Sequence, residues 1–135
     1  MNWVDPVAAH YRRVAQTSVH APSANTPAVV TLAARPGFRH YLLLVAWSYN
    51  AEPTNGALTI TGLHAGTFAI DITTEGPGPL WLPPAAGLIS TAVVVTLAAG
   101  GAGVTGKVNV LHLALPAHRV LDGQFLVPEE PVTNG

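Results

Sequence analysis

The sequence predicts an all-β fold, a single antiparallel β-sandwich with about eight strands in a jelly-roll-like arrangement. Short apolar runs alternate with turns rich in Gly and Pro along most of the 135 residues. Segments 57–63 and 67–73 alternate apolar and polar residues with a period of two, as a sheet with one wet face requires. The links are short and almost no segment favours a helix. Eight strands with frequent Gly and Pro turns could also close into a barrel, which is the alternative fold.

Each strand is placed where β-forming residues lie between turn signals. In chain order the expected strands are 14–20, 26–34, 38–49, 57–63, 67–73, 80–82, 90–98 and 104–115. Residues 63–66 form a link short enough to make a hairpin. Residues 75–79 should form a turn, and Pro83 with Pro84 should end the strand before them.

The sequence favours one domain, because 135 residues lie within the usual range of a single domain. It also shows no internal repeat. The sandwich domain is expected to span 14–115. Residues 1–13 are expected to form an N-terminal arm, either extended or helical for a turn or two. Residues 116–135 show no β pattern and are expected to form an extended C-terminal arm.

The chain has few charged residues, and this limits which partners the protein is expected to have. Asp, Glu, Lys and Arg make up 10% of the chain, whereas soluble domains average about 25%. A monomer normally covers itself with charge, so this composition favours a chain that hides surface against protein partners. Lys and Arg are scattered apart from Arg12-Arg13, and the net charge is −1, so no nucleic-acid partner is expected.

Other sequence features exclude further classes. No apolar run reaches the roughly 18 residues of a membrane span, so no membrane partner is expected. The first residues lack a basic segment followed by an apolar one, so we expect no signal peptide and synthesis in the cytoplasm. The chain has no cysteine, which excludes disulfides and thiolate metal sites.

Three strands are apolar on both faces, which a two-layer sandwich does not explain. In 38–49 the alternation places one set of residues on one face and a second set on the other. The two sets are Phe38, His40, Leu42, Leu44 and Ala46, and Tyr41, Leu43, Val45, Trp47 and Tyr49. Segments 91–97 and 110–115 are similar. The second face needs a cover, supplied either by a neighbouring subunit or by the chain's own arms.

The glycine-rich segment 101–108 nearly matches a phosphate-binding loop. Val108 stands where that loop needs a hydroxyl, and the next segment favours a strand rather than a helix. The segment is therefore interpreted as a hairpin loop in which glycine supplies positive φ.

No other pattern predicts catalysis or a cofactor. The six histidines have no metal-ligand spacing, and His112 is expected to be a hydrogen-bonded core or interface residue. A metal site built from distant histidines is the alternative. No serine lies in G-x-S-x-G and the acids fall mostly in loops or tails, so we expect no enzyme, no catalytic residue, no cofactor and no metal.

Trp47, Tyr49 and Trp81 are expected to be buried; if exposed, they could stack on a sugar.

Three stretches carry a resemblance to a protein family. They are VVTLAARPG at 29–37, the segment 47–60 with its WSY and LTI motifs, and VVTLAAGGAGVTGKVNV at 94–110. Over roughly residues 26–115 the chain resembles small bacteriophage virion structural proteins, the β-sandwich capsid decoration or cement proteins.

The resemblance implies a non-enzymatic capsid decoration protein on the outer surface of the virion. Its implied partners are the major capsid protein and further copies of itself, as a homotrimer. Trp47, Tyr49 and Leu115 are then expected at subunit contacts, and Trp3 in an arm that grips the capsid. The alternatives are a carbohydrate- or receptor-binding module, such as a head fibre or lectin-like spike, and a tail or connector protein.

Overall fold

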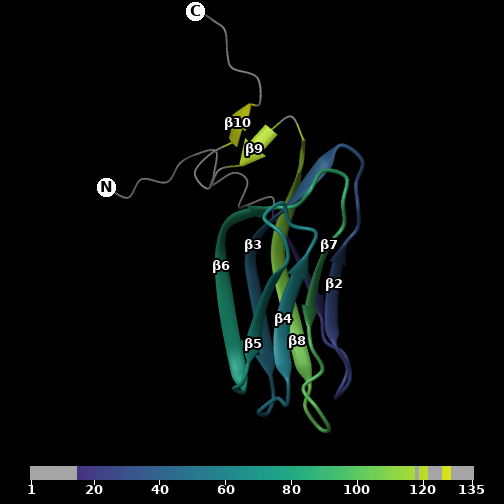
Figure 1. Ribbon diagram of the computed structural model, residues 1–135, viewed down its shortest axis with the longest axis vertical. Coiled ribbons are helices and arrows are strands. Elements are labelled where there is room, and N and C mark those ends of the chain that lie inside the picture. Colours follow the sequence, from purple (N-terminus) through teal and green to yellow (C-terminus); the bar gives the residue numbers. More distant parts are fainter. Residues whose placement is uncertain (1–14, 118, 122–125, 129–135) are drawn as a thin grey trace, which may run out of the picture.

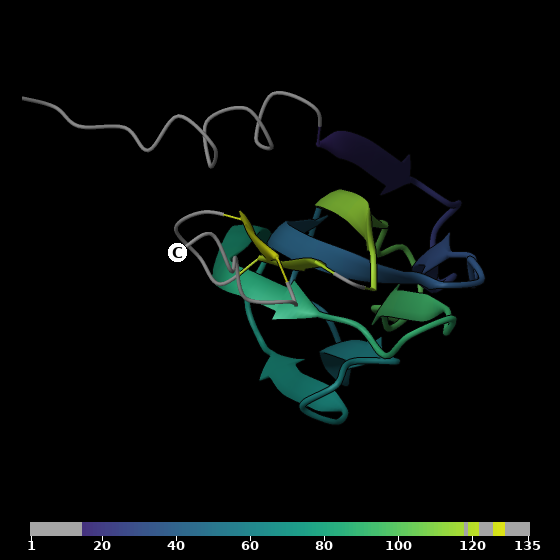
Figure 2. The ribbon, with the colours of Figure 1, turned by 90° about the horizontal axis from the view of Figure 1, so that it is seen from above.

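The computed structural model describes residues 15–117, 119–121 and 126–128, and within them all regular structure is β. Eight strands form two four-stranded antiparallel sheets that face each other as layers (Figures 1 and 2). The strands are β1 (Gln16–His20), β2 (Ala28–Leu32), β3 (Phe38–Tyr49), β4 (Gly56–Thr61), β5 (Phe68–Ile72), β6 (Gly76–Ala86), β7 (Val93–Leu97) and β8 (Gly106–Pro116).

The strand order is that of a jelly roll. Sheet I has the order β1-β8-β3-β6 and sheet II the order β2-β7-β4-β5. Only β4 and β5 are consecutive strands within one sheet; every other link along these eight strands crosses between the sheets. The predicted jelly-roll-like sandwich and the 63–66 hairpin are therefore confirmed. The glycine-rich loop after β7 is not a hairpin loop as expected, because it joins sheet II to sheet I.

The core lies between the sheets, where alternate residues of both point inward. Residues that are fully or almost fully buried there are Leu42, Val45, Tyr49, Leu58, Ile60, Val93, Val95, Leu97, Val108 and Val110. β-Branched side chains suit this pleated interior. Burying apolar area at about 25 cal/mol per Å² is the main stabilising term of such a sandwich.

The strand β6 is longer than the sequence predicts. The expected turn at 75–79 and the expected stop at Pro83-Pro84 are both wrong, because β6 runs over Gly76–Ala86. The reason is its position: β6 is an edge strand that pairs only with β3, and an edge tolerates residues without an N–H. The double proline falls in an irregular stretch, since Trp81 pairs with Leu44 and Ala85 with Leu42.

A β-bulge in β3 changes which residues face the core. Leu42 pairs with His112 of β8 and Leu44 with Leu111, so Leu43 is an extra residue without a partner on that strand. The two sets expected for 38–49 are therefore wrong beyond this point. The inward set is His40, Leu42, Val45, Trp47 and Tyr49, and Leu44 and Ala46 turn outward.

The terminal regions were expected to be arms. Residues 1–13 lie outside the described residues. Within 116–135, where no β pattern was expected, β9 (Arg119–Leu121) pairs with β10 (Leu126–Pro128), and β9 contacts β8. This small ribbon lies at one end of the sandwich (Figure 1).

Candidate functional site

The outer side of sheet I carries a continuous apolar surface. Leu44 lies opposite Leu111 of β8 on one side and Trp81 of β6 on the other. The neighbours of these residues along each strand, such as Val45, Leu80 and Val110, belong to the inner core, so this row faces away from it. The next row joins Val19, Asn109, Ala46 and Pro79. We call the surface formed by these rows and their outward neighbours the apolar face.

The apolar face is exposed along its two edge strands, β1 and β6, half-buried over most of its centre, and nearly free of charge. Trp81 is 70% exposed and Val19 is 57% exposed. The outward residues are Thr17, Val19, Leu44, Ala46, Ser48, Pro77, Pro79, Trp81, Lys107, Asn109 and Leu111. Of these only Lys107 is charged, and it lies at one end, opposite Ser48. Large exposed apolar patches of this kind mark interaction surfaces.

The outer side of sheet II differs in chemistry. Thr96 lies between Val29 and Thr59 in one row, and Val94 lies between Thr31 and Thr61 in the next. The threonine hydroxyls give water hydrogen-bonding partners across this sheet. The contrast indicates that sheet I, rather than sheet II, presents the surface to be covered.

Towards the β9 end, the chain itself covers the outer side of sheet I. Tyr41, Leu113 and Leu115 are buried in a second cluster outside the sandwich, with Leu43 and Ala15 packed against it. The second apolar face of β3 and β8 is therefore partly covered by the chain itself. This internal cover does not reach the row that contains Trp81, whose side chain remains exposed to solvent.

The residues expected at subunit or capsid contacts do not gather in one place. Tyr49 is buried between the sheets, and burial raises the pKa of its phenol. Trp47 is half-buried and packs against the same core, while Leu115 lies in the second cluster. Trp3 lies outside the described residues. The contact roles of these four residues stay predictions.

Trp81, which was expected to be buried, is exposed, so that expectation is wrong. The exposed indole follows from the register, since Trp81 faces outward opposite Leu44 while Leu80 and Leu82 pack on the core. The prolines on both sides of Trp81 could have predicted this exposure, because prolines within a strand favour a position at the edge of a sheet.

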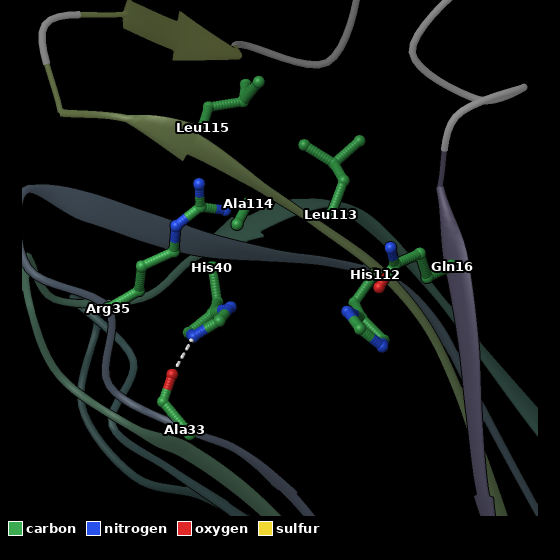
Figure 3. Close-up of a pocket in the computed structure, with 8 residues that line it drawn as sticks. All are labelled: Gln16, Ala33, Arg35, His40, His112, Leu113, Ala114 and Leu115. Carbon is green, nitrogen blue, oxygen red and sulfur yellow. Dashed lines mark hydrogen bonds between the residues drawn. The ribbon is translucent and has the colours of Figure 1, made fainter.

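A second feature is a cavity of about 330 Å³ at the end of the sandwich where β2 leads into β3 (Figure 3). Its polar lining comes from four segments, namely Gln16 of β1, Arg35 of the β2–β3 link, His40 of β3 and His112 of β8. Ala33, Leu113, Ala114 and Leu115 complete the wall. The histidines are separated by 71 intervening residues, and only the pairing of β3 with β8 brings them together.

The two histidines are buried and have different partners. His40 is 9% exposed, and its Nε2 lies 2.7 Å from the carbonyl oxygen of Ala33. His112 is 8% exposed, and its Nε2 lies 2.8 Å from the hydroxyl of Ser18. Burial, followed by the charge of His40, lowers the pKa of His112. The expectation that His112 is a hydrogen-bonded residue is confirmed.

The glycine-rich loop has the geometry expected of its glycines. Gly101 and Gly103 have φ values of 103° and 78°, in the left-handed region that favours glycine. The loop leads into β8 rather than into a helix, so its amides lack the helix N-terminus of a phosphate loop. Within the described part of the chain, no helix is long and apolar enough to cross a membrane, and no cluster of three or more His, Asp or Glu is placed to hold a metal.

Comparison with known proteins gives likeness of fold alone. No family model matches the sequence, and no curated protein matches it. Among solved structures, the chain is similar to TmCBM61 in complex with β-1,4-galactotriose, with 8% identity over 76% of this chain and 70% of the other and a TM-score of 0.40. It is also similar to the virus-like particle of the extra small virus of the prawn Macrobrachium rosenbergii, with 12% identity over 74% and 77% and a TM-score of 0.33. A de novo designed double-stranded β-helix matches with 10% identity over 71% and 97% and a TM-score of 0.37.

Proposed function

We propose that this protein is a non-enzymatic structural subunit of a bacteriophage virion, a decoration protein that binds the outer surface of the capsid as a homotrimer. The apolar face carries the proposal. It presents Trp81 and Val19 to solvent, and Lys107 is the one charged residue among the outward residues that form it. A surface of this composition resembles the core of a subunit interface, where charged residues are depleted and aromatic residues enriched.

The low charge of the whole chain supports the same proposal. Only 10% of residues are charged, so the protein has few of the groups that keep a monomer soluble. A subunit that binds the assembled capsid lattice and not its free components stabilises that lattice by mass action. Assembly requires no catalytic group, only a preformed surface, and the rigid strands of sheet I provide one.

The test combines self-association with capsid binding. Light scattering of the purified protein should give about three times the 14.0 kDa of one chain. The protein should also co-sediment with phage heads that lack it. Trp81→Lys, which places a charge on the apolar face, should abolish one or both. Thr31→Lys, at an exposed position of sheet II, is the matched control and should leave both unchanged.

Two results would contradict the proposal. A wild-type protein that stays monomeric at high concentration and fails to bind heads would remove its basis. A folded Trp81→Lys variant that trimerises and binds heads as wild type does would show that the apolar face is not the contact surface. Binding to tails but not to heads would favour a tail or connector role instead.

The exposure of Trp81 also favours a second candidate, a carbohydrate- or receptor-binding module. An exposed indole on a flat sheet can stack on the apolar side of a sugar ring. A glycan array should then give a saturable signal that Trp81→Ala abolishes without unfolding the protein. Competition by the soluble sugar separates this candidate from the first, because a sugar would not displace a protein interface.

A further inference from the structure

The cavity at the β2–β3 end has a charge pattern that the proposed assembly function does not use. The side chains that line it include Arg35 and the two histidines, and none of the lining side chains in the described part of the chain is a carboxylate. Figure 3 shows His40 and His112 on opposite sides of the cavity, with Arg35 above His40 and Gln16 beside His112. The lining therefore offers positive or neutral hydrogen-bonding groups to anything inside.

The hydrogen bond of His40 fixes the state of its other nitrogen. The carbonyl oxygen of Ala33 can only accept, so Nε2 of His40 carries the proton that it donates. Nδ1 of the neutral ring is then a bare acceptor. This atom is buried and has no partner among the described residues. Buried polar atoms in folded proteins are nearly always hydrogen-bonded, so this atom indicates a missing partner.

A bound proton reverses the role of that atom. Protonated His40 donates from both nitrogens, one to Ala33 and one into the cavity. The new donor would then need an acceptor, preferably a charged one, because charge-assisted hydrogen bonds are the strong ones. Arg35 lines the same space, and its guanidinium is held over the ring of Phe38 at 3.6 Å.

We propose that this cavity binds a small oxyanion, a carboxylate or a tetrahedral anion, together with a proton taken up by the histidine pair. The anion accepts from the protonated Nδ1 of His40 and from the guanidinium of Arg35, so its negative charge balances the positive charge that the proton brings into the cavity. Among the residues that the structure describes, no Asp or Glu lines the site to compete for these donors. A metal cation fits poorly, because Arg35 would repel it and the site supplies only two imidazoles.

Because a proton is taken up together with the anion, the affinity for the anion should depend on pH. When one proton is taken up with each anion, affinity falls by about tenfold for every pH unit above the range in which the pair binds that proton. Within the described ranges, the charged and titratable groups that line the cavity are Arg35 from the β2–β3 link, His40 from β3 and His112 from β8; Gln16 from β1 carries no charge.

The experiment follows the imidazole NMR signals of the intact protein during titration with sodium sulfate, at about pH 5.5 and pH 7.5. Sulfate keeps the same charge across this range, and sodium chloride of equal ionic strength is the reference. We expect a saturable shift of the His40 and His112 signals at the lower pH and affinity weakened by at least about tenfold at the higher pH. A parallel titration with acetate distinguishes the two sources: tighter acetate assigns a carboxylate, and tighter sulfate a tetrahedral anion.

His40→Gln is the informative variant, because its side-chain amide can keep the bond to Ala33 while removing Nδ1 and the titrating ring. It should lose sulfate binding, whereas His64→Gln, at an exposed histidine of the β4–β5 link, should bind as wild type does. If His40→Gln does not fold, His112→Gln serves in its place. Equal shifts in sulfate and chloride would leave the cavity to water and overturn the proposal. Sulfate binding that does not weaken as the pH rises would show that no proton is taken up with the anion, and this result too would overturn it.

Discussion

Tyr49, the last residue of β3, donates its hydroxyl hydrogen to the carbonyl oxygen of Ala98, 2.6 Å away. Ala98 follows β7, so this bond connects the two sheets near the end of the sandwich that holds the glycine-rich loop. The phenol lies at 2% exposure, and burial raises its pKa, so the group remains a protonated donor at neutral pH.

Tyr49→Phe should therefore destabilise the fold while leaving its packing intact. The variant keeps the ring but leaves the Ala98 carbonyl without this donor, which costs about 1–2 kcal/mol. Urea unfolding followed by circular dichroism measures the loss as a lower midpoint at an unchanged m-value. Stability equal to wild type would show that water replaces the hydroxyl, contrary to a bond that stabilises the sandwich.

Gly78 of β6 should resist substitution because of one aromatic neighbour. A Cβ at this position would overlap the indole ring of Trp47, which lies directly opposite on β3. Gly78→Ala should cost about 1–3 kcal/mol, the range for overpacking. Trp47→Leu removes the obstructing ring, so the same Gly78→Ala change should cost less in that background. An equal cost in both backgrounds, measured by urea unfolding as a double-mutant cycle, would contradict this contact.

The sequence predicts β3 with its observed bounds, and local chemistry explains why. Residues 38–49 are almost all β-forming, and Pro36-Gly37 and Asn50 provide turn signals on both sides. The bulge at Leu43 could not be predicted in the same way. Where both faces of a strand are apolar, a shift of one residue leaves the pattern unchanged, so only pairing with β8 fixes the register.

The candidate sites depend on tertiary pairing, which sequence patterns do not encode. Pro77, Pro79 and the double proline end a strand by every local rule, yet β6 continues through them because it lies at an edge. That continuation places Trp81 on the outside. In the same way, His40 and His112 have no motif spacing, and they meet only because Leu42 pairs with His112.

Trp81 should report directly on the burial of the apolar face. In a variant whose only indole is Trp81, made by Trp3→Phe and Trp47→Phe, the free protein should emit at long wavelength and be quenched readily by acrylamide. Binding to phage heads or association into trimers should shift the emission to shorter wavelength and reduce quenching, because the indole leaves water. The matching variant that retains only Trp47 should change little, since Trp47 already packs on the core. Unchanged quenching of Trp81 in the bound state would place the contact elsewhere.

Acid should destabilise the protein through His112. Burial and the nearby charge of His40 lower the pKa of His112 in the folded state, whereas the unfolded chain has the ordinary value of 6.5. As the pH falls below about 6.5, the unfolded state binds the proton first, so the contribution of His112 to stability is complete above this pH and is lost as the pH falls toward the folded-state pKa.

His112→Gln should remove that part of the pH dependence. Urea unfolding between about pH 7.5 and pH 5, in chloride buffers without oxyanions, should show a steeper loss of stability for wild type than for the variant. His64→Gln, at an exposed position, should follow the wild-type curve. Parallel curves for wild type and His112→Gln would mean that the folded protein binds this proton as easily as the unfolded chain does. That result would contradict the desolvation that the buried position of His112, at 8% exposure, implies.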